Sequence, residues 1–589
     1  MTGKRPAAGG LAIAALLFLW LAWPAFAAQV VGEPFLAAPI WVYNNWSAYD
    51  ELSDSAPLTQ ELAMRELREI LRLRQTGVRI DYYVMDAFWF EPDGGYRLWR
   101  KQYWPNGPDD WLAACRDNDI KPGLWFGTNG TVHLKPIEKW RDSLTSKKDA
   151  MALYTGGFLS DFMDALQYWH DRGIRLFKLD FADFDAVTAG DEHAFTPREI
   201  RRRNREALRD ALLAFRQKNP DVVMDAFNGF VGDVGSPQTH VPRSAMRWLE
   251  VFDALYAGDP RPSNVPEMNF WRSVDIYSDR MVRRFEQGGV PLRRIDSTGF
   301  MIGDTGTIFG RRTAGWQGML LLTMARGGWI NTIHGNLEFL DDADVRWFAK
   351  AQAIYDGLQR EGTTKAFGGM AGDRLPYGFA SATAKGSLYT VVNPAQSVQE
   401  AKLPAVANEQ GPSGEGRVLF RDAGFAPVLR PGTVQLGPGQ LAVIGYGRYA
   451  DADNDLGVGS DIRIPRSIAP IPAHFTRAGN EIAVTTTIEP PAEGNLRIIL
   501  RQRNENGSVM RSMTEAKMGQ HFMISATQGG RTLRVENQYD KVIWAGLSWA
   551  VGEIESGEFV PGMPVEIHLS SADPDVSLHL EGQLYAVEY

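Results

Sequence analysis

The stretch Gly173-Ile-Arg-Leu-Phe-Lys-Leu-Asp-Phe181 decides how the rest of the chain is interpreted. A mostly apolar run leads to Lys178 and Asp180, a pattern that is typical of a buried strand leaving a core. Because alternate strand residues point to the same side, the ammonium and the carboxylate are expected to lie together. A neighbouring ammonium keeps a carboxylate ionised, as a nucleophile must be. The plain alternative is an ion pair at a strand end, so the surrounding sequence has to decide.

Length, charge and the N-terminus limit the class of protein. The 589-residue chain is too long for a single core and predicts several domains. Its net charge of -9 argues against nucleic acid and against anionic membrane surfaces as partners. Lys4, Arg5, an apolar run over residues 11–23 and the sequence Ala25-Phe-Ala27 indicate a signal peptide, with an uncleaved anchor as the alternative. We therefore expect an exported, periplasmic or secreted protein without a stable membrane span; the sequence leaves its oligomeric state open.

From residue 38 to about residue 360, short apolar runs alternate with longer amphipathic ones. Eight strand–helix units over this length predict an α/β fold, a (β/α)8 barrel whose parallel sheet is covered by helices. The strands are predicted at 39–45, 80–86, 121–127, 174–180, 221–227, 270–276, 299–304 and 329–334, and the helices at 58–75, 111–118, 158–171, 197–217, 279–287, 314–326 and 341–358. Residues 229–269 are too many for a normal loop, so we expect an insertion or a further strand there.

The sequence changes character after about Ala366, where short β-like segments are separated by Gly and Pro clusters. The domains are predicted as a signal peptide at 1–27, the barrel at 28–365, a C-terminal antiparallel β-sandwich at 366–450 and a further β-sandwich-like module at 460–589. Between the last two, Asp451, Asp453 and Asp455 are spaced like calcium ligands. However, Ile462 stands where a bidentate Glu would close the site, which favours a plain linker.

The carboxyl ends of the strands surround one pocket in a (β/α)8 barrel, and catalytic groups come from several of them. Two carboxylates about 5–5.5 Å apart would support retaining glycoside hydrolysis. The sequence shows no strand–turn–helix G-x-S-x-G, no phosphate-cradling loop and no H-E-x-x-H. The predicted strand ends carry Trp46, Asp86, Trp89, Trp125, Lys178, Asp180, Asp275 and Asp304.

Six segments of the predicted barrel carry recognisable motifs in the same chain order. They are Tyr43-Asn-Asn-Trp46, Tyr83-Val-Met-Asp-Ala-Phe-Trp89, Trp104-Pro-Asn-Gly107 with Gly123-Leu-Trp-Phe126, Phe177-Lys-Leu-Asp180, Trp271-Arg-Ser-Val-Asp-Ile276 and Gly299-Phe-Met-Ile-Gly303. Together they resemble the strand ends of glycoside hydrolase clan D, the α-galactosidase families 27 and 36.

The resemblance implies a role for each motif residue. Asp180 would be the nucleophile and Asp275 the acid/base, and no cofactor or metal would be needed because two carboxylates suffice. Asn228 would either read a sugar hydroxyl or serve as a turn residue. The substrate-binding residues implied on this interpretation are Trp46, Asp86, Trp89, Trp125, Lys178, Asn228 and Arg272.

Two departures from the family pattern bear on this assignment. Ala87 stands where the families carry a second acid, so one galactose-type hydroxyl contact is missing. The spacing from Arg272 to Asp275 is one residue shorter than in family 27, which makes Asp259 the reserve acid/base. The predicted function is an exported retaining α-glycosidase that acts on an oligo- or polysaccharide carrying galactose or a related pyranose. The alternatives are a catalytically inactive carbohydrate-binding protein, or the same mechanism on a gluco- or arabino-configured substrate.

Overall fold

A computed structural model of the chain describes residues 35–46, 58–87, 89–131, 134–231, 241, 243–259, 272–297, 300–302, 315–406, 414–459, 465–478, 481–487, 494–503, 522–542, 546–571 and 579–589. The predicted signal peptide, Trp271 and Asp304 lie outside the described residues.

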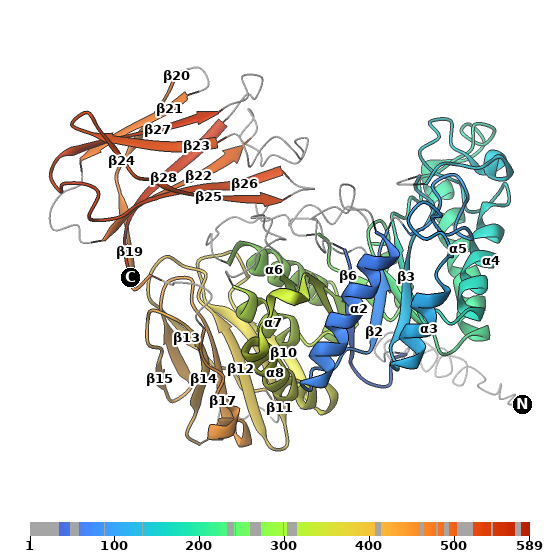
Figure 1. The fold of residues 1–589 in the computed structure, drawn as a ribbon, viewed down its shortest axis with the longest axis horizontal. Coiled ribbons are helices and arrows are strands. Elements are labelled where there is room, and N and C mark those ends of the chain that lie inside the picture. The colour runs from blue at the N-terminus through green and yellow to red at the C-terminus, as the bar shows by residue number, and fades with distance from the viewer. Residues whose placement is uncertain are drawn as a thin grey trace, which may run out of the picture.

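The N-terminal part is a parallel sheet in the order β7-β6-β5-β4-β3-β2-β1-β9-β8. Figure 1 labels β2, β3 and β6 of this sheet. Its strands are β1 Ile40–Asn44, β2 Tyr82–Met85, β3 Lys121–Gly127, β4 Leu176–Asp180, β5 Val223–Ala226, β6 Ala254–Tyr256, β7 Ile295–Asp296, β8 Phe300–Ile302 and β9 Ile330–Gly335. The two ends of the sheet, β7 and β8, are separated in the chain only by residues 297–299, and β7 also contacts β9. The contact between β7 and β9 brings the two ends of the curled sheet together, and this arrangement agrees with the predicted (β/α)8 barrel.

Helices cover the outside of this sheet (Figure 1). They are α2 Gln60–Gln75, α3 Asp109–Asp117, α4 Phe158–Asp171, α5 Pro197–Lys218, α6 Ser273–Gln287, α7 Trp316–Ala325 and α8 Asp342–Glu361. The start of α5 illustrates the local cause: the Thr196 hydroxyl accepts a hydrogen bond from the Glu199 N–H, the Glu199 carboxylate accepts one from the Thr196 N–H, and Pro197 opens the helix.

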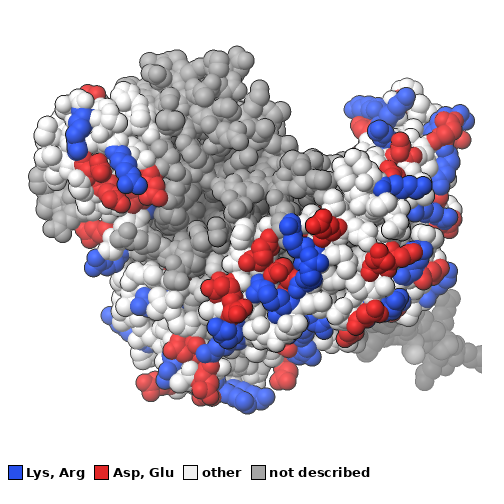
Figure 2. All heavy atoms as spheres, in the orientation of Figure 1, with Lys and Arg blue, Asp and Glu red and all other residues white. Residues whose placement is uncertain are grey.

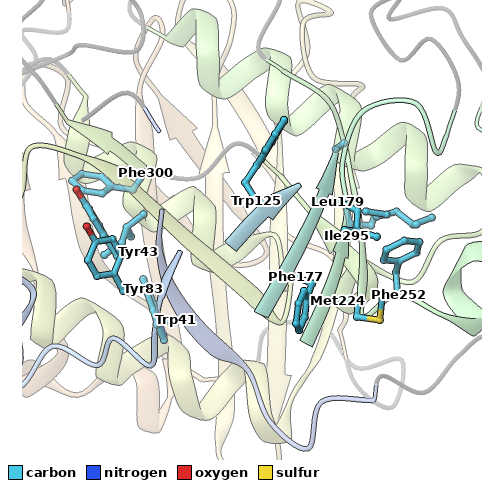
Figure 3. Packing of buried hydrophobic residues seen from close by; sticks show 14 of the residues in the cluster. Trp41, Tyr43, Tyr83, Trp125, Phe177, Leu179, Met224, Phe252, Ile295 and Phe300 are labelled. Carbon is cyan, nitrogen blue, oxygen red and sulfur yellow. The ribbon is translucent and has the colours of Figure 1, made fainter. Parts of the chain in front are cut away.

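The core explains why the strands were recognisable. Every residue of β4 is buried, and β3 is buried after its first residue, as expected for strands covered on both faces. Phe177 and Leu179 of β4 and Met224 of β5 are among the packed side chains of this core (Figure 3). The short apolar runs in the sequence are therefore strands whose two faces are both covered: Leu176 packs with other strand residues, and Phe177 packs against Phe215 of α5.

The predicted sixth strand, 270–276, is wrong. The sixth strand is β6, which lies inside the long 229–269 segment, and Ser273 instead begins α6. Tyr277, Met281 and Phe285 are buried at helical spacing, and Asp275 in the first turn suits the positive end of the helix dipole. Residues 273–287 form a helix because their buried residues recur at helical spacing. The true sixth strand was missed because β6 has only three residues, too few to show a strand period.

Antiparallel sheets follow the barrel, as predicted (Figure 1). One region forms a six-stranded and a three-stranded sheet, and a later region forms two five-stranded sheets. The strands are β10 Thr363–Gly368, β11 Tyr377–Thr383, β12 Gly386–Val392, β13 Gln399–Lys402, β14 Arg417–Asp422, β15 Val428–Arg430, β16 Thr433–Leu436, β17 Leu441–Gly447, β18 Gly457–Gly459, β19 Ser467–Ile471, β20 His474–Ala478, β21 Glu481–Thr487, β22 Asn495–Arg503, β23 Phe522–Gln528, β24 Arg531–Leu533, β25 Glu536–Val542, β26 Gly546–Ile554, β27 Pro564–Ser571 and β28 His579–Glu588.

The described residues can be searched for membrane spans and metal ligands. Within the described ranges, no helix is both long and apolar enough to span a bilayer, and no group of three or more His, Cys, Asp or Glu side chains could hold a metal ion. Figure 2 shows acidic and basic side chains intermingled on the face in view. Asp451, Asp453 and Asp455 lie in an exposed or half-exposed turn region around two short 3-10 helices, Arg448–Ala450 and Ala452–Asn454.

Candidate active site

Asp180 stands at the carboxyl end of β4 and is almost fully buried. One carboxylate oxygen accepts hydrogen bonds from the backbone N–H groups of Phe181 (2.8 Å) and Asn228 (3.0 Å), and the other accepts one from Trp125 Nε1 (3.1 Å). Phe181 has a left-handed φ of 49°, which a non-glycine residue rarely adopts, and this turn brings its N–H back to Asp180. Three donors from three segments thus fix the carboxylate in one orientation.

Lys178 lies on the same side of β4 and is also buried. Its ammonium donates to Asp86 Oδ2 at 2.7 Å and lies 4.0 Å from the centre of the Phe227 ring. Burial alone would lower the pKa of Lys178, but Asp86 and then Asp180 outweigh it and raise that pKa. Lys178 is therefore a permanent cation between two strand-end carboxylates, which confirms the alignment predicted from its alternation with Asp180.

The Asp180 carboxyl titrates near neutrality. Burial is the main cause and raises its pKa to about 6, and the negative charge of Asp259 acts in the same direction. Lys178 and the Trp125 indole oppose this rise by stabilising the ionised form. The balance makes the charge state of Asp180 sensitive to any change in its neighbours.

Asp259 is the second carboxylate of this site. It follows β6, is partly exposed, and accepts hydrogen bonds from the Asn228 side-chain amide (3.3 Å) and the Tyr256 hydroxyl (3.2 Å). Because the Asn228 backbone N–H donates to Asp180, this one residue bridges the two carboxylates. Asn228, predicted as a sugar contact or a turn residue, thus lies between the two acids.

Asp275 and Arg272 do not lie at a strand end, contrary to the prediction. Both are fully buried: Arg272 Nη1 donates to Asp275 Oδ2 at 3.0 Å, and Arg272 Nη2 donates to Asp422 of β14. The Arg272 Nε also donates to the Gly439 carbonyl. These contacts form an ion cluster between α6 and the six-stranded sheet, so neither side chain is available to a sugar in this structure.

The three predicted pocket tryptophans have different environments. Trp46 is half-buried, with its ring centre 5.9 Å from that of His334, while Trp125 donates to Asp180. Trp89 is completely buried and packs on Trp99, with ring centres 4.8 Å apart. Its indole N–H donates to a backbone carbonyl of β3. Trp89 is therefore a core residue, and its predicted place in the pocket wall is wrong.

Sequence reasoning missed a set of polar residues behind Asp86. The Asn45 side-chain oxygen accepts the Asp86 N–H (2.8 Å), and its amide donates to Glu66 (3.3 Å), which also accepts from the Tyr83 hydroxyl. Burial raises the pKa of Glu66 to about 8. His334, at the end of β9, is neutral because burial and then the Lys178 charge lower its pKa to about 3. The sequence held one indication that His334 belongs to the site, because it stands at the end of the predicted strand 329–334.

A buried carboxyl pair lies on β5 and β7, the two strands that flank β6 in the sheet. Asp225 of β5 and Asp296 of β7 interact through a side-chain hydrogen bond, and burial is the main cause that raises the pKa of each. Lys178 stabilises the ionised form of both. Two close carboxyls cannot both ionise easily, so the pair retains a proton at neutral pH.

A barrel with a lysine, two bridged carboxylates and an acidic hydrogen-bonding partner at its strand ends has the parts of a sugar-hydrolysing site. No family model and no curated protein matches the sequence. Among solved structures, the chain is similar to the galactosidase domain of an α-galactosidase–sucrose kinase, with a TM-score of 0.50 and 13% identity over 71% of this chain and 57% of that one.

Two further solved structures have lower TM-scores. A family 36 α-galactosidase variant from Geobacillus stearothermophilus, in complex with stachyose, gives 0.48 at 12% identity over 69% of this chain and 55% of that one. A family 27 β-L-arabinopyranosidase from the same organism gives 0.47 at 13% identity over 70% and 97%. The chain thus spans a little over half the length of the first two. At 13% identity the first of these matches shows a likeness of fold, in agreement with the predicted barrel.

Proposed function

We propose that the protein is a retaining glycosidase in which Asp180 is the nucleophile and Asp259 the acid/base. The observation that carries this proposal is the Asn228 bridge, which holds a buried carboxylate and a more exposed one at the same mouth of the barrel. The buried, lysine-flanked Asp180 suits attack on carbon, and Asp259, half in solvent, suits exchange of a proton with water.

The two steps balance with these groups alone. Asp180 attacks the anomeric carbon while Asp259 gives its proton to the departing oxygen, forming a covalent glycosyl ester. Asp259, now ionised, takes a proton from water while the water oxygen bonds to the anomeric carbon; the ester bond to Asp180 breaks, its carboxylate is restored and Asp259 is protonated again. The first step needs Asp180 ionised, and the Lys178 ammonium favours that form. The second step starts from the glycosyl ester of Asp180.

The substrate class follows from the polar groups near the nucleophile. Lys178 and Asp86 together offer a donor and an acceptor to neighbouring hydroxyls, and Trp46 offers an aromatic ring. We propose a terminal α-linked pyranoside, galactose or a related sugar, because Ala87 removes one of the acidic contacts of galactose-specific relatives. Export is proposed as well, on the basis of residues 1–27.

Replacement of Asp259 and of Asp275, each by Asn in a separate variant, tests which of them is the acid/base. Asp259→Asn should lower kcat/KM for a poor leaving group by about 10²–10⁴, and azide should rescue turnover of an activated aryl glycoside as a glycosyl azide. Asp275→Asn is the matched control and should show no azide effect. Azide rescue of the Asp275 variant instead, or undiminished activity of the Asp259 variant, would refute the assignment. Saturable sugar binding without any turnover by the wild type would favour a carbohydrate-binding protein.

A further inference from the structure

The outer face of α5 carries a row of arginines. Arg198, Arg201, Arg202, Arg205 and Arg209 recur at helical spacing, so they share one side of the helix. Arg247, from the 3-10 helix η2 at Arg243–Glu250, lies opposite them. These six arginines, with Glu206 and Trp248, line a groove of about 400 Å³, called here the arginine groove.

Arginine charges are concentrated in this groove. Among the described residues, the carboxylates that form ion pairs with these arginines are Asp185, Glu206, Asp210 and Glu250. Burial, followed by the charge of Arg201, lowers the pKa of Arg205. Arg198 also lies in the first turn of α5, where the helix dipole disfavours a cation. A bound anion would relieve both kinds of repulsion.

The groove is connected to the candidate active site through the loop after β4. Its aromatic floor is Trp248, which stacks on Phe184 with ring centres 5.3 Å apart. Phe184 follows Asp180 by four residues, and the Arg205 guanidinium lies 5.2 Å from the Phe184 ring centre. The groove therefore runs along the flank of the barrel from a segment that also supports the nucleophile.

We infer that the arginine groove binds a short segment of an anionic glycan, one that carries carboxylate or sulfate groups. Guanidinium forks match the two oxygens of these groups, and a row of about 16 Å, from the 1.5 Å rise per residue between Arg198 and Arg209, suits an oligosaccharide. The negative charge of the rest of the chain opposes a long polyanion such as duplex DNA. The inference is independent of hydrolysis at Asp180.

Direct binding measurements on the full chain test this inference. The probes are a heparin hexasaccharide for sulfate, an oligogalacturonate for carboxylate, and a short DNA duplex, each titrated at about 50 mM and about 200 mM salt. Arg198→Gln/Arg202→Gln/Arg247→Gln removes three groove charges. Arg116→Gln/Arg141→Gln/Arg430→Gln is the matched control, because it removes three exposed arginines elsewhere and leaves the same net charge.

The groove variant should bind at least one of the two glycans about tenfold more weakly at the lower salt, whereas the control should match the wild type. Which glycan responds identifies the anionic group. Both variants should keep wild-type turnover of an uncharged aryl glycoside, or, if that activity is absent, the wild-type melting temperature. The inference is overturned if neither glycan binds the wild type, if both variants weaken binding equally, or if duplex DNA binds the groove more tightly than the glycans.

Discussion

Replacement of Lys178 by Met tests how the site controls the charge of Asp180, the proposed nucleophile. The ammonium interacts with Asp86 at 2.7 Å and lowers the pKa of Asp180 against the effect of burial. An opposite charge nearby typically changes a carboxyl pKa by about 1–3. Without it, the Asp180 pKa should rise from about 6 to about 7–9. At pH 6 the ionised fraction would fall by roughly five- to five-hundred-fold, and kcat/KM by at least as much.

The assay is the pH profile of kcat/KM on an aryl glycoside, whose acid limb reports the free enzyme. Because Lys178→Met leaves Asp86 buried without its partner, a loss of about 3–5 kcal/mol of stability is also expected. The double variant Lys178→Met/Asp86→Asn removes that unpaired charge, and the pH of its acid limb still reports the pKa of Asp180. Lys139→Met, an exposed lysine on the short helix Glu138–Ser143, is the control. An acid limb that stays at the wild-type pH in the double variant would refute the reasoning.

Two further substitutions test the surrounding architecture. Glu66 has a raised pKa in the fold, so its own contribution to stability should be complete below its ordinary pKa near 4.5 and be lost as the pH rises to about 8, by up to about 5 kcal/mol. Glu66→Gln should therefore lose less stability than the wild type between pH 5 and pH 8.5 in urea unfolding, and an equal loss in both proteins would contradict this reasoning. Arg272→Met leaves the carboxylates of Asp275 and Asp422 buried and unpaired, so the free energy of unfolding should fall by about 3–5 kcal/mol; an unaltered melting temperature would show that the cluster is not stabilising.

The sequence predicted the barrel because its parallel strands are buried on both faces. β4 shows this plainly: all its residues are buried and most are apolar, and its alternation correctly placed Lys178 on the same side as Asp180. α5 was equally recognisable, since Thr196, Pro197 and Glu199 mark its start. These features are local, so they can be read without knowledge of the tertiary structure.

The errors arose where tertiary contacts decide. β6 has three residues, too few for any period, whereas the Trp271-Arg-Ser-Val-Asp275 motif resembled a strand and belongs in part to α6. Arg272 is buried by an aspartate 150 positions away in the chain, which no local pattern reveals. Trp89 could equally have lined a pocket or filled the core, and only its packing against other aromatic rings decides.

The central claim is that Asp180 forms a covalent bond with the sugar. A 2-fluoro glycoside with an activated leaving group, incubated with the purified protein and followed by peptide mass spectrometry, tests it most directly. We predict time-dependent inactivation with one fluoroglycosyl mass on the peptide that contains Asp180, and no label in Asp180→Asn. A label on another carboxylate, or turnover that proceeds without any covalent intermediate, would contradict the account.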